Sequence, residues 1–192
     1  MRLSFFLVVV ALVGNSAMAQ EILPVCDRTE GVKNFIVQQI NSDQGGDKTC
    51  EEITEEDLAS LTRVAPRNAN IINFKAGDFT GLVNLEILNI RSNPYETLPE
   101  GLFRDLGKLK TLVIIATGLR YYPDDFLKDT PQLENCHCFA NGVRSISESI
   151  FQRLGQLEHL KVLDFDRSLQ DPERARLEAI FPLESGVQLN FF

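Results

Sequence analysis

Residues 85–93, Leu-Glu-Ile-Leu-Asn-Ile-Arg-Ser-Asn, decide the fold of this chain. Apolar residues stand at the first, fourth and sixth positions of the stretch, and an asparagine closes it at the ninth. The same pattern opens four other segments, of which the first is degraded. The leading residues of the five copies are Leu61, Leu85, Leu109, Leu133 and Leu160, spaced 24, 24, 24 and 27 residues apart. Self-similarity at such a period predicts a repeat architecture, in which stacked units bury a continuous core that no single unit could bury alone.

Each copy continues with a second apolar group, such as Leu98-Pro99 and Phe103 in the second copy. The pattern resembles the extracellular leucine-rich repeat of about 24 residues, LxxLxLxxNxLxxLPxxxFxxL. The resemblance covers residues 58–168 and implies an α/β solenoid whose parallel strands form a curved sheet on the concave face. Residues alternate along a strand, so the inner positions of LxL point into the core and the residues between them face the concave side.

Both ends of the repeat array need caps, because a terminal repeat has no neighbour on one side. Residues 20–57 are predicted to be a helical N-terminal cap, which resembles that of secreted bacterial leucine-rich repeat proteins. A second helix is expected from Glu55 to about Thr62. Residues 169–192 are predicted to be a helix and strand that close the stack. The apolar helical face at the N-terminus comprises Val32, Phe35, Ile36 and Ile40, and the final strand alternates through Val187, Leu189 and Phe191.

Residues 1–19 have the pattern of a secretory signal peptide: a basic start at Arg2, an apolar run over 3–13 and the small-residue site Ala17-Met18-Ala19. The apolar run is shorter than the roughly 20 residues that a membrane span needs, and no later segment is a better candidate. We therefore expect that the signal peptide is cleaved and that the mature protein is secreted or periplasmic, with no membrane span.

The four cysteines form two separate groups. Cys26 and Cys50 lie near the expected mature N-terminus, and we predict a disulfide between them because an exported protein meets an oxidising environment. Such a bridge would stabilise the fold by about 3 to 4 kcal/mol in the chain-entropy model. Cys136 and Cys138 flank His137, and strand alternation sends the cysteines inward and the histidine outward. The three side chains cannot then converge on one metal ion, so we predict that both cysteines pack in the core.

Composition excludes several functional classes. The net charge of -8 argues against a nucleic-acid partner, because phosphate binding needs surplus Lys and Arg. The outward strand positions offer no Ser, no Cys and a single His, so no enzyme, cofactor or metal is predicted. His137 and Asp164 are expected on neighbouring strands, where the pair could titrate together or supply two ligands to a metal.

The outward positions form three columns across the predicted sheet. Read along the solenoid, this face runs from basic through apolar to acidic. It is either an ordinary solvated surface or a binding site. Arg67 and Arg91 should be neighbours, an unfavourable pairing unless a partner's acidic group lies between them. In the final strand, Gln188 is expected beside Asp164 and Asn190 beside Asp166. The candidate ligand-binding residues are Arg67, Asn89, Arg91, Val113, Ile115, His137, Phe139, Asp164 and Asp166.

These observations favour a binding module that recognises a protein or peptide through the concave face. The six strands offer a face of roughly 500 Å², below the roughly 800 Å² per partner of a standard interface, which suits a peptide or loop. The first alternative is a structural or self-assembling envelope component, joined through the outer edge of the final strand. A hydrolytic enzyme is the remaining alternative. The chain is expected to be a monomer, with an edge-strand dimer as the competing state.

Overall fold

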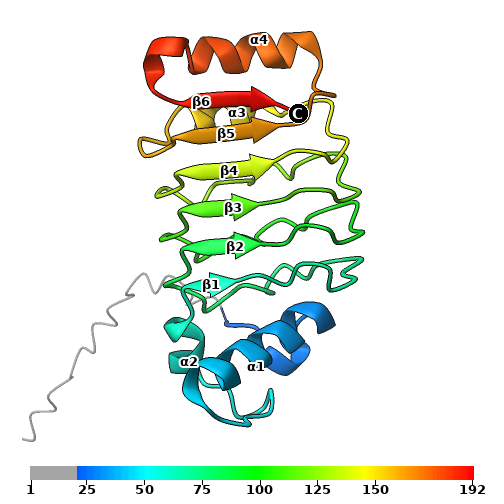
Figure 1. Cartoon of the computed structure of the whole chain (residues 1–192), viewed down its shortest axis with the longest axis vertical. Helices are drawn as coiled ribbons and strands as arrows, with labels where there is room; N and C mark the ends of the chain where they lie inside the picture. The colour runs from blue at the N-terminus through cyan, green and yellow to red at the C-terminus, as the bar shows by residue number, and fades with distance from the viewer. Residues whose placement is uncertain (1–20) are drawn as a thin grey trace, which may run out of the picture.

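The computed structural model describes residues 21–192, and the expected signal peptide lies outside them. The repeats stack in chain order into a six-stranded parallel sheet with the order β1-β2-β3-β4-β5-β6 (Figure 1). The strands are β1 (Arg63–Val64), β2 (Ile87–Asn89), β3 (Thr111–Val113), β4 (Asn135–Cys138), β5 (Val162–Phe165) and β6 (Gln188–Phe191). This arrangement confirms the predicted α/β solenoid.

The strand register follows the repeat spacing as far as β5. Leu88, Leu112, Cys136 and Leu163 align across β2 to β5, and all four side chains are fully buried. This column is the inner wall of the core, as the LxL pattern predicts. No helix of residues 21–192 is both long and apolar enough to cross a membrane.

The register of the last strand differs from the prediction by two residues. Leu189, not Val187, aligns with Leu163. The reason is that the last repeat contains the helix α4 (Asp171–Ile180) and the 3-10 turn η2 (Leu183–Ser185), which together lengthen the return to the sheet. Asn190 therefore lies beside Asp164, where Gln188 was expected.

The convex side carries the returning segment of each repeat. Most repeats return through turns, but the fourth contains the helix α3 (Glu148–Leu154), which accounts for the 27-residue spacing that follows Leu133. Between the sheet and these segments lies the core, which includes the stacked rings of Tyr122 and Phe126 with centroids 4.3 Å apart. The helix α4 continues the convex side, since Arg176 pairs with Glu148 and lies over the ring of Phe151.

The N-terminal cap consists of the 3-10 turn η1 (Val25–Asp27) and the helices α1 (Glu30–Gln44) and α2 (Glu55–Ser60), at the opposite end of the stack from α4 (Figure 1). The helix α1 buries Val32, Ile36 and Ile40, and Phe35 is partly buried. The predicted disulfide between Cys26 and Cys50 is present, with Cα atoms 5.1 Å apart. The helix α2 ends earlier than expected, because Leu61 already has the extended conformation that leads into β1.

A buried arginine fastens the cap to the first repeat. The guanidinium of Arg28 donates hydrogen bonds to the carbonyl oxygens of Asp78 and Thr80, each at 2.7 Å, and to that of Leu23 at 3.0 Å. Only 2% of Arg28 is exposed, and this burial lowers its pKa to about 10. The sequence pattern gave no indication of this contact, because its acceptors are main-chain atoms.

Asparagines join neighbouring repeats where the chain leaves the sheet. The side chain of Asn93 accepts a hydrogen bond from the backbone N–H of Ala69 at 2.9 Å and donates one to the carbonyl of Pro66 at 2.8 Å. Two repeats later, the side chain of Asn141 likewise accepts a hydrogen bond from the backbone N–H of Thr117 and donates one to the carbonyl of Ile114. At this corner one residue in each of four repeats has the left-handed backbone conformation: Asn68, Ser92, Ala116 and Ala140 have φ of 55°, 56°, 54° and 56°.

Candidate functional site on the concave face

The outward residues of the strands form three columns on the face of the sheet opposite the core. The parallel register and the main-chain bonds that extend it align them across β1 to β6. The first column is Arg63, Ile87, Thr111, Asn135, Val162 and Gln188. The second is Ala65, Asn89, Val113, His137, Asp164 and Asn190. The third is Arg67, Arg91, Ile115, Phe139, Asp166 and Phe192. We call these three columns the concave face; all nine candidate residues belong to it.

A hydrogen-bonded trio occupies the second column near its C-terminal end. The Nδ1 atom of His137 lies 2.5 Å from Oδ2 of Asp164, and Nδ2 of Asn190 donates to Oδ1 of Asp164 at 2.7 Å. Asp164 is 5% exposed because both partners cover it. The neighbouring pair was predicted from the repeat spacing. Asn190 was not, because the final strand was placed two residues out of register.

The second carboxylate of this region, Asp166, is also buried. It is 3% exposed, its Oδ1 accepts a hydrogen bond from the backbone N–H of Asn141 at 2.6 Å, and burial raises its pKa. It lies between Phe139 and Phe192 in the third column, and the centroids of these two rings are 4.7 Å apart. The predicted acidic end is therefore not an accessible acidic surface: its two carboxylates are covered by the side chains beside them.

The basic end is accessible and unpaired. Arg67 and Arg91 are exposed neighbours in the third column, as the sequence predicts. Within residues 21–192 their guanidinium groups make no hydrogen bond or ion pair. No carboxylate of residues 21–192 pairs with either guanidinium, although the two residues occupy neighbouring positions of the column.

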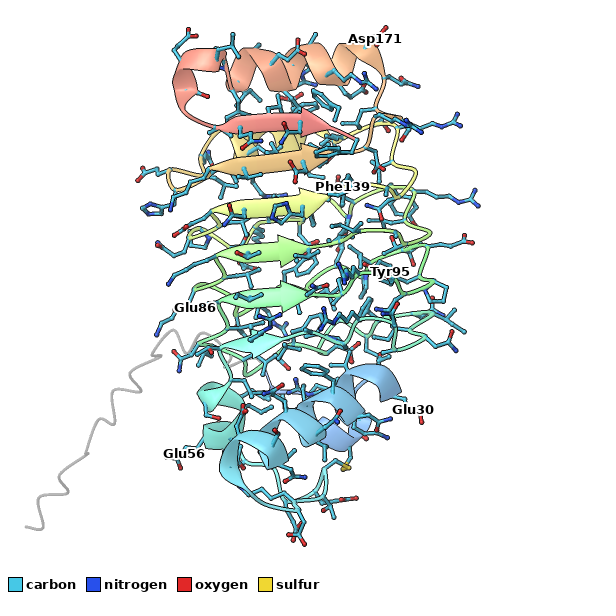
Figure 2. The ribbon with its side chains drawn as sticks, in the orientation of Figure 1. Glu30, Glu56, Glu86, Tyr95, Phe139 and Asp171 are labelled. Carbon is cyan, nitrogen blue, oxygen red and sulfur yellow. A yellow bond between two sulfur atoms is a disulfide. The ribbon has the colours of Figure 1, made fainter. Side chains whose placement is uncertain are left out.

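The charges just before the N-terminal ends of β2 to β5 are arranged differently. Glu86, labelled in Figure 2 at the start of β2, pairs with Lys110 at 2.9 Å. In the following repeats Glu134 pairs with Lys161 at 2.7 Å. This edge alternates in sign and neutralises itself, whereas the two arginines across the sheet do not.

Apolar side chains fill the centre of the concave face. Ile87, Ile115 and Phe139 are partly exposed, and Phe139 is labelled in Figure 2 where the chain leaves β4. Val113 is 9% exposed, so it offers a partner less surface than its position suggested. Phe192, which is 53% exposed, extends the apolar region. Sequence reasoning missed Phe192 for the same reason that it missed Asn190.

The two central cysteines lie beneath this region, fully buried, as strand alternation predicts. They were expected to pack as separate side chains, but Cys136 and Cys138 are joined in a disulfide. Residues two apart on one strand face the same side of the sheet, which brings the two sulfur atoms together. In residues 21–192 the group of three possible metal ligands is Cys26, Cys50 and Glu51, whose cysteines are also bridged. The pair of His137 and Asp164 has no third ligand beside it in that part of the chain.

Comparison with solved structures supports the fold. A leucine-rich repeat protein from Leptospira interrogans matches 73% of this chain and 34% of its own, with a TM-score of 0.59 and 22% identity. An internalin from Listeria monocytogenes matches 90% of this chain and 46% of its own, with a TM-score of 0.65 and 20% identity. This chain thus spans less than half the length of either structure. Protein-family models and curated proteins gave no match.

Proposed function

We propose that this chain is an exported binding module, secreted or periplasmic, that recognises a protein or peptide through its concave face and carries out no catalysis itself. The fold supports this proposal, because a stack of short parallel strands presents a continuous row of side chains that no single repeat could offer. The solved structures that share the fold are an internalin and another leucine-rich repeat protein. Export rests on the sequence of residues 1–19, which are outside the described residues.

The observation that carries the proposal is the apolar centre around Ile115 and Phe139. These side chains are partly exposed on a sheet face that no other part of residues 21–192 covers. An apolar patch with a polar rim often marks a binding site, and large apolar side chains near the centre of an interface commonly supply most of its affinity. The small area of the face favours a peptide or an exposed loop as the occupant.

The test is capture of partners from envelope and secreted fractions by the mature protein. The double variant Ile115→Ser, Phe139→Ser should lose a partner that the wild type captures while remaining folded, with a melting temperature lowered only by the loss of the contact between Phe139 and Phe192. Ile72→Ser is the matched control, because Ile72 is 61% exposed and lies outside the concave face. A partner retained by the double variant would contradict recognition through this face.

The alternative, self-assembly, is favoured by one observation at the C-terminal end of the stack. A hollow of about 720 Å³ lies between the end of α4 and β6, and its lining includes Phe181, Leu189 and the fully exposed Leu183. Apolar surface of this kind could join copies of the chain. Gel filtration with light scattering separates the two functions. A monomer across the measured concentrations supports the binding module, and a concentration-dependent oligomer that Leu183→Asp dissociates supports self-assembly.

A further inference from the structure

We infer that the partner presents a carboxylate to Arg67 and Arg91 and places apolar side chains over Ile115 and Phe139, in an extended acidic peptide segment. This inference rests on the proposed function and specifies the chemistry of the ligand. It comes from the accessible charges of the concave face, from their lack of internal partners and from the spacing between the arginines and the apolar centre.

The accessible charge of the concave face has the opposite sign to that of the chain. The chain has 27 acidic and 19 basic residues. Yet the carboxylates in the three columns, Asp164 and Asp166, are 5% and 3% exposed. The exposed charges there are Arg63, Arg67 and Arg91. A positive, partly apolar face on an acidic protein favours anionic partners over cationic ones.

The two neighbouring arginines need a carboxylate that the described chain does not supply. Their strands are about 4.8 Å apart, so the like charges disfavour each other unless an anion lies between them. The pairs Glu86–Lys110 and Glu134–Lys161 show that just before β2 to β5 neighbouring charges are matched within the chain. A guanidinium can bind a carboxylate through two parallel hydrogen bonds, and two adjacent guanidinium groups can enclose one.

The spacing defines the segment that would fit. With strands about 4.8 Å apart, the midpoint between Arg67 and Arg91 lies about 7 Å from the level of Ile115 and about 12 Å from that of Phe139. An extended chain advances about 3.3 Å per residue and its side chains alternate. An acidic residue between the arginines therefore places the residues two and four positions away over Ile115 and Phe139, on the same side of the segment.

The experiment selects peptides from a random library displayed on phage against the mature protein. Selected peptides should be enriched in Asp or Glu with apolar residues two and four positions away. A labelled peptide of this kind should bind roughly tenfold or more weakly when its acidic residue is replaced by Gln, since a hydrogen-bonded charge of this type contributes 1.5 kcal/mol or more. The loss should be larger at low salt than at high salt.

Matched protein variants complete the test. Arg67→Glu with Arg91→Glu should weaken binding of the labelled peptide by at least the same factor. Arg120→Glu with Arg144→Glu is the control, because these arginines are exposed, lie in adjacent repeats outside the concave face and change the net charge equally. Thermal unfolding of each variant checks that the fold is kept.

The outcomes separate this inference from the proposed function. Peptides without an acidic preference, or equal binding by both arginine variants, overturn the acidic ligand while leaving concave-face binding intact if Ile115→Ser, Phe139→Ser still abolishes it. Peptides whose binding survives Ile115→Ser, Phe139→Ser contradict the proposed function itself. Both the acidic ligand and binding through the concave face are supported if the selected peptides are enriched in acidic residues and bind the Arg120, Arg144 control but not the Arg67, Arg91 variant.

Discussion

His137 and Asp164 stand 27 positions apart in the sequence, yet the imidazole Nδ1 and the carboxylate Oδ2 lie 2.5 Å apart on neighbouring strands. The carboxylate is 5% exposed and also receives the Asn190 amide. The trio therefore ties β4, β5 and β6 together on the side of the sheet opposite the core. Its polar groups satisfy one another, so this end of the concave face is a structural connection more than an acidic surface.

Removing the carboxylate should expose how much the trio contributes. Asp164→Ala leaves His137 and Asn190 without their shared acceptor, and we expect the free energy of unfolding to fall by about 1 to 3 kcal/mol. Denaturant unfolding followed by circular dichroism measures the change. Asn135→Ala is the control, since that partly exposed side chain, also on β4, makes a single hydrogen bond of 3.4 Å to Thr111. Equal effects of the two substitutions would show that the trio adds nothing beyond an ordinary polar contact.

The repeat spacing was sufficient to predict the solenoid, because LxL positions recur at a fixed interval and each strand aligns on the previous one. It failed at β6. There the closing helix α4 and the turn η2 have no counterpart in the earlier copies, so the 24-residue interval carried Val187 into the position that Leu189 occupies. That error of two residues hid Asn190 and Phe192 from the candidate site.

Burial was the other limit of the sequence pattern. Alternation correctly assigned Asp164 and Asp166 to the concave face, but it could not show that neighbouring side chains cover both. Arg28 was missed altogether, since its binding site is built from backbone carbonyls of a distant turn. Periodicity predicts which residues face a surface. It does not predict the exposed fraction of each side chain, because that depends on the sizes of its neighbours across the sheet.

The cysteines offer a chemical test. All four are bridged in the structure, so the unfolded, unreduced protein should contain no reactive thiol. Thiol titration in denaturant measures this directly, and two thiols per chain that persist when Cys26 and Cys50 are both replaced by Ser would show that Cys136 and Cys138 are unpaired in solution. Replacing both Cys26 and Cys50 by Ser should lower the melting temperature, because their bridge closes a loop within the N-terminal cap and restricts the unfolded chain, which stabilises the fold by about 3 to 4 kcal/mol in the chain-entropy model.

Asp57 near the start of α2 makes stability depend on acid pH. It forms a capping box with Thr54, in which each side chain accepts a hydrogen bond from the backbone N–H of the other residue. Hydrogen bonding to the Lys48 ammonium, 2.7 Å away, and to the backbone of Thr54 holds the pKa of Asp57 well below its usual range. A depressed pKa stabilises the fold above the ordinary carboxyl pKa, and this contribution disappears as the pH falls below that value towards the folded one. Unfolding free energies measured from neutral to strongly acidic pH should therefore fall less steeply for Asp57→Asn than for wild type. Parallel curves would contradict this role.

Replacing an alanine that has the left-handed backbone conformation by glycine should stabilise the protein. Ala140 has φ of 56°, a conformation that costs a residue with a Cβ atom about 1 kcal/mol relative to glycine. Ala140→Gly should therefore raise the free energy of unfolding by up to about 1 kcal/mol, less the greater entropy of glycine in the unfolded chain. Ala175→Gly, within α4, is the control and should lower it by about 1 kcal/mol. Destabilisation by Ala140→Gly would place that residue in a different backbone conformation.

The assignment of inward and outward residues is tested most directly on β3 and the residues after it. Leu112 is fully buried, so Leu112→Ser should cost several kcal/mol, because it leaves a cavity and places a hydroxyl in an apolar core. Ile115 is partly exposed on the concave face, and Ile115→Ser should change the free energy of unfolding by about 0.5 kcal/mol or little more. Both substitutions replace an apolar residue by serine, at positions three residues apart, so their effects on the unfolded chain should be nearly equal. If Ile115→Ser proved the more damaging, the repeat would be out of register and the apolar centre of the proposed binding face would belong to the core instead.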